Sequence, residues 1–201
     1  MANVTAQMVK EIRDSTGAPF LDCKKALEET AGDFEKAIEI LRIKGLTKVA
    51  KRLGRETPEG TITSYIHPGG KIGVMVEVNC ETDFVARNEE FQAFAKEIAM
   101  QIAAANPSYI SREEIPESVL LKEKEVMKAQ VIESGKPETV AEKIVQGKVE
   151  KYYEETCLID QAYIRDPKIK INDLLGLLVA KIGENIVIRR FVRYQLGEPI
   201  G

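Results

Sequence analysis

The stretch from Ile72 to Phe91 constrains the fold most, because its hydrophobic pattern changes period along the way. Apolar residues occupy alternate positions from Ile72 to Val78, which is typical of a strand with one buried face. The pattern breaks at a polar run, Asn79 to Asp83, and returns at Asn88 with helical spacing. A strand that leads through a polar turn into a helix predicts mixed α and β structure.

The polar turn is followed by one large ring, Phe84, and two interpretations of this residue are open. In the first, Thr82 or Asp83 caps the following helix and Phe84 anchors the turn in the core. In the second, Phe84 has a function, because loops held by a rigid scaffold often carry contacts that packing does not need. Spacing alone does not choose between them.

Length and composition fit an ordinary soluble protein of one or two domains. The chain has 201 residues, of which 44% are hydrophobic and 30% charged. Its net charge of −3 creates no overall field that attracts nucleic acid or an anionic membrane. No apolar run approaches the ~20 residues that a bilayer span needs. We therefore expect no direct nucleic-acid partner and no membrane partner.

The usual tools of catalysis and metal binding are scarce in this sequence. Cys23, Cys80 and Cys157 are far apart and form no CxxC pair, which argues against a disulfide framework and a zinc site. Three unpaired cysteines suit a reducing cytoplasm. His67 is the single histidine, and no phosphate-binding loop, dinucleotide fingerprint or nucleophile elbow occurs. We predict that the chain is not an enzyme and binds no metal or cofactor.

Residues 1–54 are expected to form a three-helix domain. Thr5 stands at an N-cap position, Pro19 fits the first turn of the second helix, and Asp33 caps the third. Helices this short depend on packing against each other, because isolated ones are marginal in water. The domain suits docking onto another protein, although a packing module without a site is also open.

Basic residues from Lys44 to Arg55 are interleaved with apolar ones, which predicts a helical connector with a basic face. Such a face can bind phosphates or can simply be solvated. Turn residues cluster at Thr57 to Gly60 and mark the boundary of the next domain.

Residues 55–201 are expected to form an α+β core. A β-hairpin over 61–78 turns at Pro68 to Gly70, and an amphipathic helix follows from Phe91. Near the C-terminus, the β-branched run from Glu184 to Tyr194 predicts another strand. If that strand pairs with the hairpin, the core is a small antiparallel sheet packed with helices.

An insertion at about 111–156 differs from the rest of the core. Ser111 and Glu114 form a capping-box pattern, and a charged run rich in Glu and Lys follows. Gly135 to Pro137 interrupts the run. Two charged helices joined by a short turn predict a projecting helical hairpin, which suits an arm better than an active site.

Three segments resemble the bacterial translation elongation factor Ts family. They are MVKEIRDSTGAPFLDCKKALEET, Met8 to Thr30; EVNCETDFVARNEEF, Glu77 to Phe91; and KIGENIVIRRF, Lys181 to Phe191. The second contains Thr82-Asp83-Phe84-Val85, the most distinctive tetrapeptide of that family. The resemblance implies an N-terminal ubiquitin-associated-like (UBA-like) three-helix domain, an α+β core and an inserted coiled-coil hairpin.

The resemblance also implies guanine-nucleotide exchange on elongation factor Tu, without covalent chemistry. In this family the Thr82–Val85 segment lies at the magnesium site of the partner, where Phe84 would wedge between side chains and Asp83 would contact the GTP-binding domain. Because Mg²⁺ bridges phosphate oxygens to protein, displacing it weakens nucleotide binding. A wedge of this kind predicts that Phe84 is at least partly exposed in the free protein.

The resemblance also implies that four residues of this chain match positions on the N-terminal docking surface of the family. They are Lys10, Arg13, Phe20 and Lys24, with Phe20 in a stretch where members often have glycine or methionine. Longer family members contain a duplicated core, whereas this chain has room for one copy. The resemblance therefore implies a homodimer, paired through the sheet faces.

Two alternatives to an exchange factor are kept. One is a ribosome- or RNA-associated module that uses the basic residues 44–55 and 189–193, although the acidic pI and the lack of stacking aromatics count against it. The other is a thiol enzyme built on Cys80, since the sequence does not place His67 relative to that thiol.

Overall fold

A computed structural model describes residues 4–16, 18–50, 52, 54–135 and 137–199. The protein belongs to the α+β class, as the sequence predicted. It divides into two compact units that are each assembled from separate parts of the chain. Unit 1 contains Met1–Thr61, Val78–Ala93 and Asp173–Val187, and unit 2 contains Ile62–Glu77, Phe94–Asn172 and Ile188–Gly201.

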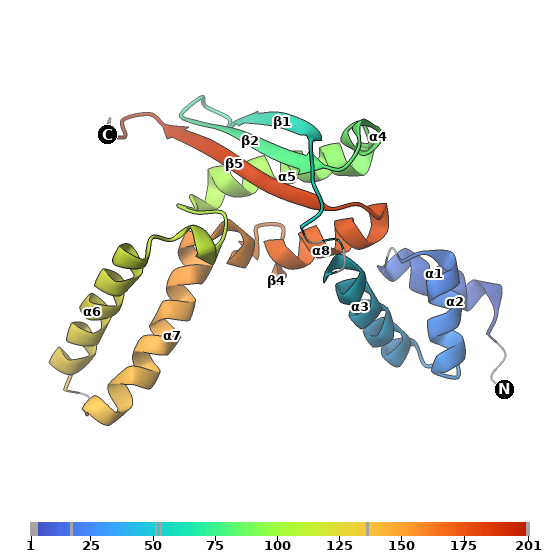
Figure 1. Cartoon of the computed structure of the whole chain (residues 1–201), viewed down its shortest axis with the longest axis horizontal. Coiled ribbons are helices and arrows are strands. Elements are labelled where there is room, and N and C mark those ends of the chain that lie inside the picture. The colour runs from blue at the N-terminus through green and yellow to red at the C-terminus, as the bar shows by residue number, and fades with distance from the viewer. Residues whose placement is uncertain (1–3, 17, 51, 53, 136, 200–201) are drawn as a thin grey trace. The chain divides into compact units, whose positions relative to one another are not determined.

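Unit 1 begins with three helices that pack against each other (Figure 1). They are α1, Ala6–Thr16; α2, Phe20–Glu29; and α3, Phe34–Ala50. Two predicted caps are present, because Thr5 Oγ1 accepts a hydrogen bond from Met8 N and Asp33 Oδ1 accepts one from Lys36 N, both at 3.2 Å. The buried residues form one cluster: Val9, Ile12, Cys23, Ala26, Leu27, Ala37 and Leu41.

The third helix is longer than the sequence suggested. It runs without a break through the first part of the expected basic connector and ends at Ala50. Gly45 lies inside it and does not end it, because a single glycine costs a helix only about 1 kcal/mol relative to alanine. Within the expected connector, Lys51 and Leu53 lie outside the described residues.

A three-stranded sheet has the order β1-β2-β5. Its strands are β1, Glu59–Ile66; β2, Ile72–Cys80; and β5, Ile186–Gln195 (Figure 1). The predicted β1–β2 hairpin closes with a hydrogen bond of 2.9 Å from His67 N to Ile72 O. Leu196 N donates to Lys71 O at 2.8 Å, so the end of β5 lies beside the start of β2 and the two strands run antiparallel.

Alternation in β2 creates one buried face, formed by Val74, Val76, Val78 and Cys80. Gly60 in β1 is required by the close approach of the two strands. Its φ is +153°, and a Cβ at this position would collide with the carbonyl oxygen of Val78. Only glycine accommodates both conditions.

Two helices contribute further buried residues. They are α5, Glu89–Ala105, and α8, Ile171–Ile182. In α5, Phe91, Ile98 and Ile102 are fully buried at helical spacing, as predicted. The prediction missed a two-stranded sheet formed by β3, Ala162–Tyr163, and β4, Asp166–Lys170. A strand of two residues is too short to produce a period in the sequence.

The inserted segment forms two helices, α6, Glu117–Glu133, and α7, Glu138–Thr156, which lie side by side in Figure 1. The capping-box prediction at Ser111 and Glu114 is wrong. Ser111 makes no side-chain cap bond there, and the Glu114 carboxylate accepts from Ile110 N at 2.8 Å. Pro116 is the N-cap residue of α6 instead. Within the described ranges, no helix combines the length and apolar character needed to cross a bilayer.

Candidate functional site

The Thr82 turn, residues Thr82–Val85, follows β2 directly and opens the short helix α4, Asp83–Ala86. Thr82 is the cap. Its backbone is extended, with φ −129° and ψ 154°, and its hydroxyl accepts from Val85 N at 3.3 Å. Of the two candidate capping residues, the structure therefore selects Thr82, while Asp83 occupies the first turn of the helix.

The Thr82 turn buries one side chain and exposes another. Val85 is only 6% exposed, whereas Phe84 is 80% exposed. Phe84 has the largest exposed fraction of the large hydrophobic residues in the described part of the chain. Burying such a ring is worth about 1.5–3 kcal/mol, and Phe84 forgoes most of this gain. The core-anchor interpretation of Phe84 is wrong, and the predicted exposure is confirmed.

A distant carboxylate holds the backbone of the Thr82 turn. Glu184 Oε2 accepts from Glu81 N at 3.1 Å and from Thr82 N at 3.0 Å, and Glu184 Oε1 accepts from the Thr82 hydroxyl at 2.7 Å. Sequence reasoning did not identify Glu184 as part of the site. In the sequence, Glu184 could have been noticed because it lies in the third segment that resembles the family, between Gly183 and the strand β5.

Asp83 presents its carboxylate at the surface. It forms an ion pair of 2.7 Å with Arg87 one helical turn later, and both side chains are mostly exposed. Exposed pairs of this kind contribute little to stability, because water screens them. The Asp83 carboxylate and the Phe84 ring are therefore both accessible to a partner.

Cys80 precedes the turn but does not have the properties of a nucleophile. Its thiol donates to Thr82 O at 3.2 Å. Burial, reinforced by the nearby charge of Glu184, raises the pKa of Cys80 to about 11. Because the thiolate is the reactive form and Cys80 is fully buried, this thiol has neither the ionisation nor the exposure that a nucleophile needs. The thiol-enzyme hypothesis thereby loses its chemical basis.

The four predicted N-terminal docking residues are all exposed on α1 and α2: Lys10, Arg13, Phe20 and Lys24. Phe20, about half exposed, is followed by the more exposed Leu21. Lys24 lies 3.8 Å from Glu28 on the same helix. This surface thus combines exposed apolar and basic side chains, a mixture that suits a protein partner.

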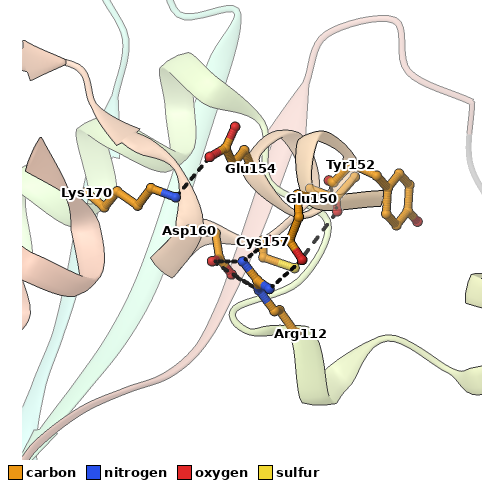
Figure 2. A network of polar contacts seen from close by, with 8 residues as sticks. Arg112, Glu150, Tyr152, Glu154, Cys157, Asp160 and Lys170 are labelled. Atoms are coloured by element: carbon orange, nitrogen blue, oxygen red, sulfur yellow. Dashed lines mark hydrogen bonds and ion pairs between the residues drawn. The ribbon is translucent and has the colours of Figure 1, made fainter. Parts of the chain in front are cut away.

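A second polar cluster, the hairpin base, consists of Arg112, Glu150, Tyr153 and Asp160 in unit 2. Figure 2 shows the Arg112 guanidinium between the two carboxylates, at 2.7 Å from Asp160 and 3.0 Å from Glu150. The same guanidinium lies 4.4 Å from the centre of the Tyr153 ring. Its hydrogen bonds with Asp160 raise the pKa of Arg112 further, so that the group remains charged.

The surroundings of the hairpin base indicate a structural role. Cys157 and Tyr152 lie beside it in Figure 2, and burial raises the pKa of both. Arg112 is matched by acceptors from two other segments, so its charge is already compensated within the unit. Among the described residues, no group of three or more His, Cys, Asp or Glu side chains is placed to hold a metal ion.

Several of the basic residues proposed for RNA binding are engaged with carboxylates. Lys44 pairs with Glu29 at 2.8 Å, Arg190 with Glu77 at 2.6 Å, and Arg193 with Glu198 at 3.0 Å. Ion pairs of this kind lower the local positive charge that phosphate binding requires.

Comparison with known proteins gives one consistent family. A family model described as "Elongation factor TS" matches residues 2–198. Elongation factor Ts of Thermodesulfovibrio yellowstonii is 62% identical over 195 residues, covering 97% of both chains. Elongation factor Ts of Thermoanaerobacter sp. (strain X514) is 60% identical over 98% of this chain and 97% of the relative. The protein of that name from Anaeromyxobacter sp. (strain K) is 61% identical, covering 100% of this chain and 91% of its own length.

Proposed function

Because the chain belongs to the elongation factor Ts family, we propose that it is the guanine-nucleotide exchange factor for elongation factor Tu in translation elongation. The observation that carries the proposal is the exposed Phe84 ring, held on a capped and anchored turn within the most distinctive tetrapeptide of the family. An exposed aromatic on a fixed support can fill a partner pocket and act as a binding hot spot. The proposed place of action is the cytoplasm.

The proposed exchange needs no covalent chemistry. The factor binds the GTPase and lowers its affinity for GDP, and by linkage GDP lowers the affinity for the factor equally. We propose that Phe84 enters the partner beside its magnesium site while Asp83 contacts the GTP-binding domain. Displacing the groups that hold Mg²⁺ removes much of the electrostatic attraction between protein and phosphates, so GDP leaves.

Residues 1–54 are proposed to be a UBA-like domain that docks on the same partner through Lys10, Arg13, Phe20 and Lys24. Support comes from the separate buried cluster of α1–α3 and from the exposure of these four side chains. Residues 55–201 would then be the α+β core. The helices α6 and α7 are proposed to be a coiled-coil hairpin inserted at about 111–156.

A homodimer is proposed because one face of the sheet in unit 2 exposes a set of large apolar residues. These are Ile62, Ile66, Met75, Val192 and Tyr194. In β5 the Arg193 side chain donates to Ala103 O on α5 at 3.5 Å, so the neighbouring exposed residues Val192 and Tyr194 point to the opposite face of the strand. Exposed apolar clusters of this kind mark protein interfaces.

Sedimentation velocity tests the dimer. The wild-type chain is expected to sediment as a dimer, and the double variant Ile62→Glu, Tyr194→Glu as a monomer with weaker exchange activity. A wild-type monomer with full activity at working concentration would remove this proposal.

The exchange proposal is tested by fluorescent-GDP release from elongation factor Tu. The wild-type chain is expected to accelerate release in proportion to its concentration until binding saturates. The same assay without the chain gives the spontaneous rate. Equal rates with and without the chain would overturn the assignment.

A further inference from the structure

We propose that Glu184 is a positioning residue for nucleotide exchange, which fixes the Thr82 turn so that Phe84 is presented to the partner. The effect of Glu184 on nucleotide exchange rests on the proposed function. The anchoring of the turn by one carboxylate can be tested without the partner. Glu184 itself contacts neither nucleotide nor metal in this proposal, and it acts through the turn.

The geometry assigns both oxygens of Glu184 to this task. One oxygen accepts from two consecutive backbone amides, Glu81 N and Thr82 N, at 3.1 and 3.0 Å. The other accepts from the Thr82 hydroxyl at 2.7 Å, and that hydroxyl in turn accepts from Val85 N. The carboxylate is therefore connected through Thr82 to the first turn of the helix that carries Phe84.

A reciprocal contact holds Glu184 in place. The side chain of Glu81 accepts from Asn185 N at 2.6 Å, while the backbone N–H of Glu81 donates to Glu184. Asn185 is buried, and its side-chain amide donates to Arg55 O at 2.9 Å. The end of β2 and the start of β5 thus exchange carboxylate-to-backbone hydrogen bonds, although about a hundred residues separate them in sequence.

These contacts matter for binding because an ordered turn loses less conformational entropy when a partner engages it. Hydrogen bonds to a charged acceptor are stronger than neutral ones, so the carboxylate restricts the turn more than water does. Without Glu184, the amides of Glu81 and Thr82 turn to solvent and Phe84 samples more orientations. The expected loss in exchange activity is about tenfold.

The first test requires no partner. Amide hydrogen exchange at Glu81 and Thr82 is measured by NMR in the wild type, in Glu184→Ala and in a control, Glu90→Ala. Glu90 is a carboxylate in the same unit that pairs with Lys181 at 2.7 Å. Faster exchange at both amides only in Glu184→Ala supports the anchoring, whereas unchanged protection overturns it.

The second test is a double-mutant cycle in the GDP-release assay with Glu184→Ala, Phe84→Ala and the double variant. If Glu184 acts by presenting Phe84, Glu184→Ala lowers the release rate about tenfold in the wild-type background and less than about twofold in the Phe84→Ala background. A general loss of stability would instead lower both backgrounds alike. Independent, multiplicative losses would therefore contradict the positioning role.

Two further variants separate charge from reach. Glu184→Gln keeps an oxygen for the two amides and an NH₂ group that the Thr82 hydroxyl can accept from, but it loses the charge, so amide protection and activity are expected to lie between those of the wild type and of Glu184→Ala. Glu184→Asp keeps the charge but shortens the side chain, so the amides should lose protection; this variant replaces Glu184→Ala if that one fails to fold. If the wild-type chain releases no GDP, the proposed function fails, and the amide measurements still decide whether Glu184 anchors the turn.

Discussion

The Thr82 turn and the hairpin base are both fixed by carboxylates that come from distant segments, yet they differ in what they leave exposed. At the hairpin base, Asp160 and Glu150 surround Arg112, and the charges compensate one another. At the Thr82 turn, Glu184 binds backbone amides, and the side chain of Phe84 remains 80% exposed. One network is complete within its unit, and the other supports a group that lacks a covering surface in its own unit.

This difference teaches how to separate structural from functional polar networks. A network whose charges are matched by one another is expected to stabilise the fold, so disrupting it should lower the free energy of unfolding. A network that holds an apolar side chain in solvent gives up burial energy, and protein recognition offers a physical reason for that loss. Substitutions at the two regions should therefore change different measured quantities.

The largest expected effect is at Phe84. Phe84→Ala should lower the stimulated rate of GDP release about 100-fold, as expected for an aromatic hot spot, and leave the melting temperature unchanged because the ring is exposed. Leu121→Ala, which removes another exposed apolar side chain on α6, is the control and should retain activity. A fully active Phe84→Ala variant would contradict the functional role assigned to the Thr82 turn.

Arg112→Ala should show the opposite behaviour. We expect the free energy of unfolding to fall by about 2 kcal/mol, because two carboxylates lose a charged hydrogen-bond donor, while GDP release changes less than about twofold. Urea denaturation measures the first quantity. Lys151→Ala, which breaks a mostly exposed pair with Glu155, is the control and should cost less than about 0.5 kcal/mol. An Arg112→Ala variant as stable as this control would contradict the structural role.

The buried thiols of the two regions should respond alike to pH. Burial raises the pKa of Cys80 to about 11 and also raises that of Cys157. Above the ordinary thiol pKa, the folded state then binds more protons than the unfolded state, so stability falls as pH rises towards 11, by up to about 1.4 kcal/mol per pH unit for one group. Cys80→Ser and Cys157→Ser should each reduce this slope in denaturation curves between pH 8 and about 10.5. Slopes unchanged in both variants would show that neither thiol titrates as expected.

The smallest expected effect concerns Arg87 beside the Thr82 turn. Arg87→Ala removes an exposed pair with Asp83 and should change the free energy of unfolding by less than about 0.5 kcal/mol. The change should shrink further in 1 M salt, where charges are screened. A loss above 1 kcal/mol would mean that this pair, and not Glu184, holds the turn.

Much of the fold follows from local sequence patterns. The alternation in β2 and β5, the spacing of buried residues in α5, and the caps at Thr5 and Asp33 were all predictable from neighbouring residues. The short β3–β4 sheet was not predictable, because two residues give no period. The start of α6 was predicted at the wrong residues, since Glu114 bonds to Ile110 N instead of forming the capping box.

For the candidate site, the sequence by itself determined the turn and its family resemblance, but left Phe84 with two opposite interpretations. Only the tertiary structure decided that Val85 enters the core and Phe84 does not, because burial depends on what surrounds a residue and not on its own hydrophobicity. Only the fold brings Glu184 to the amides of Glu81 and Thr82. Hydrophobic periodicity indicates which residues share one face of a helix or strand. It does not predict a hydrogen bond between segments about a hundred residues apart.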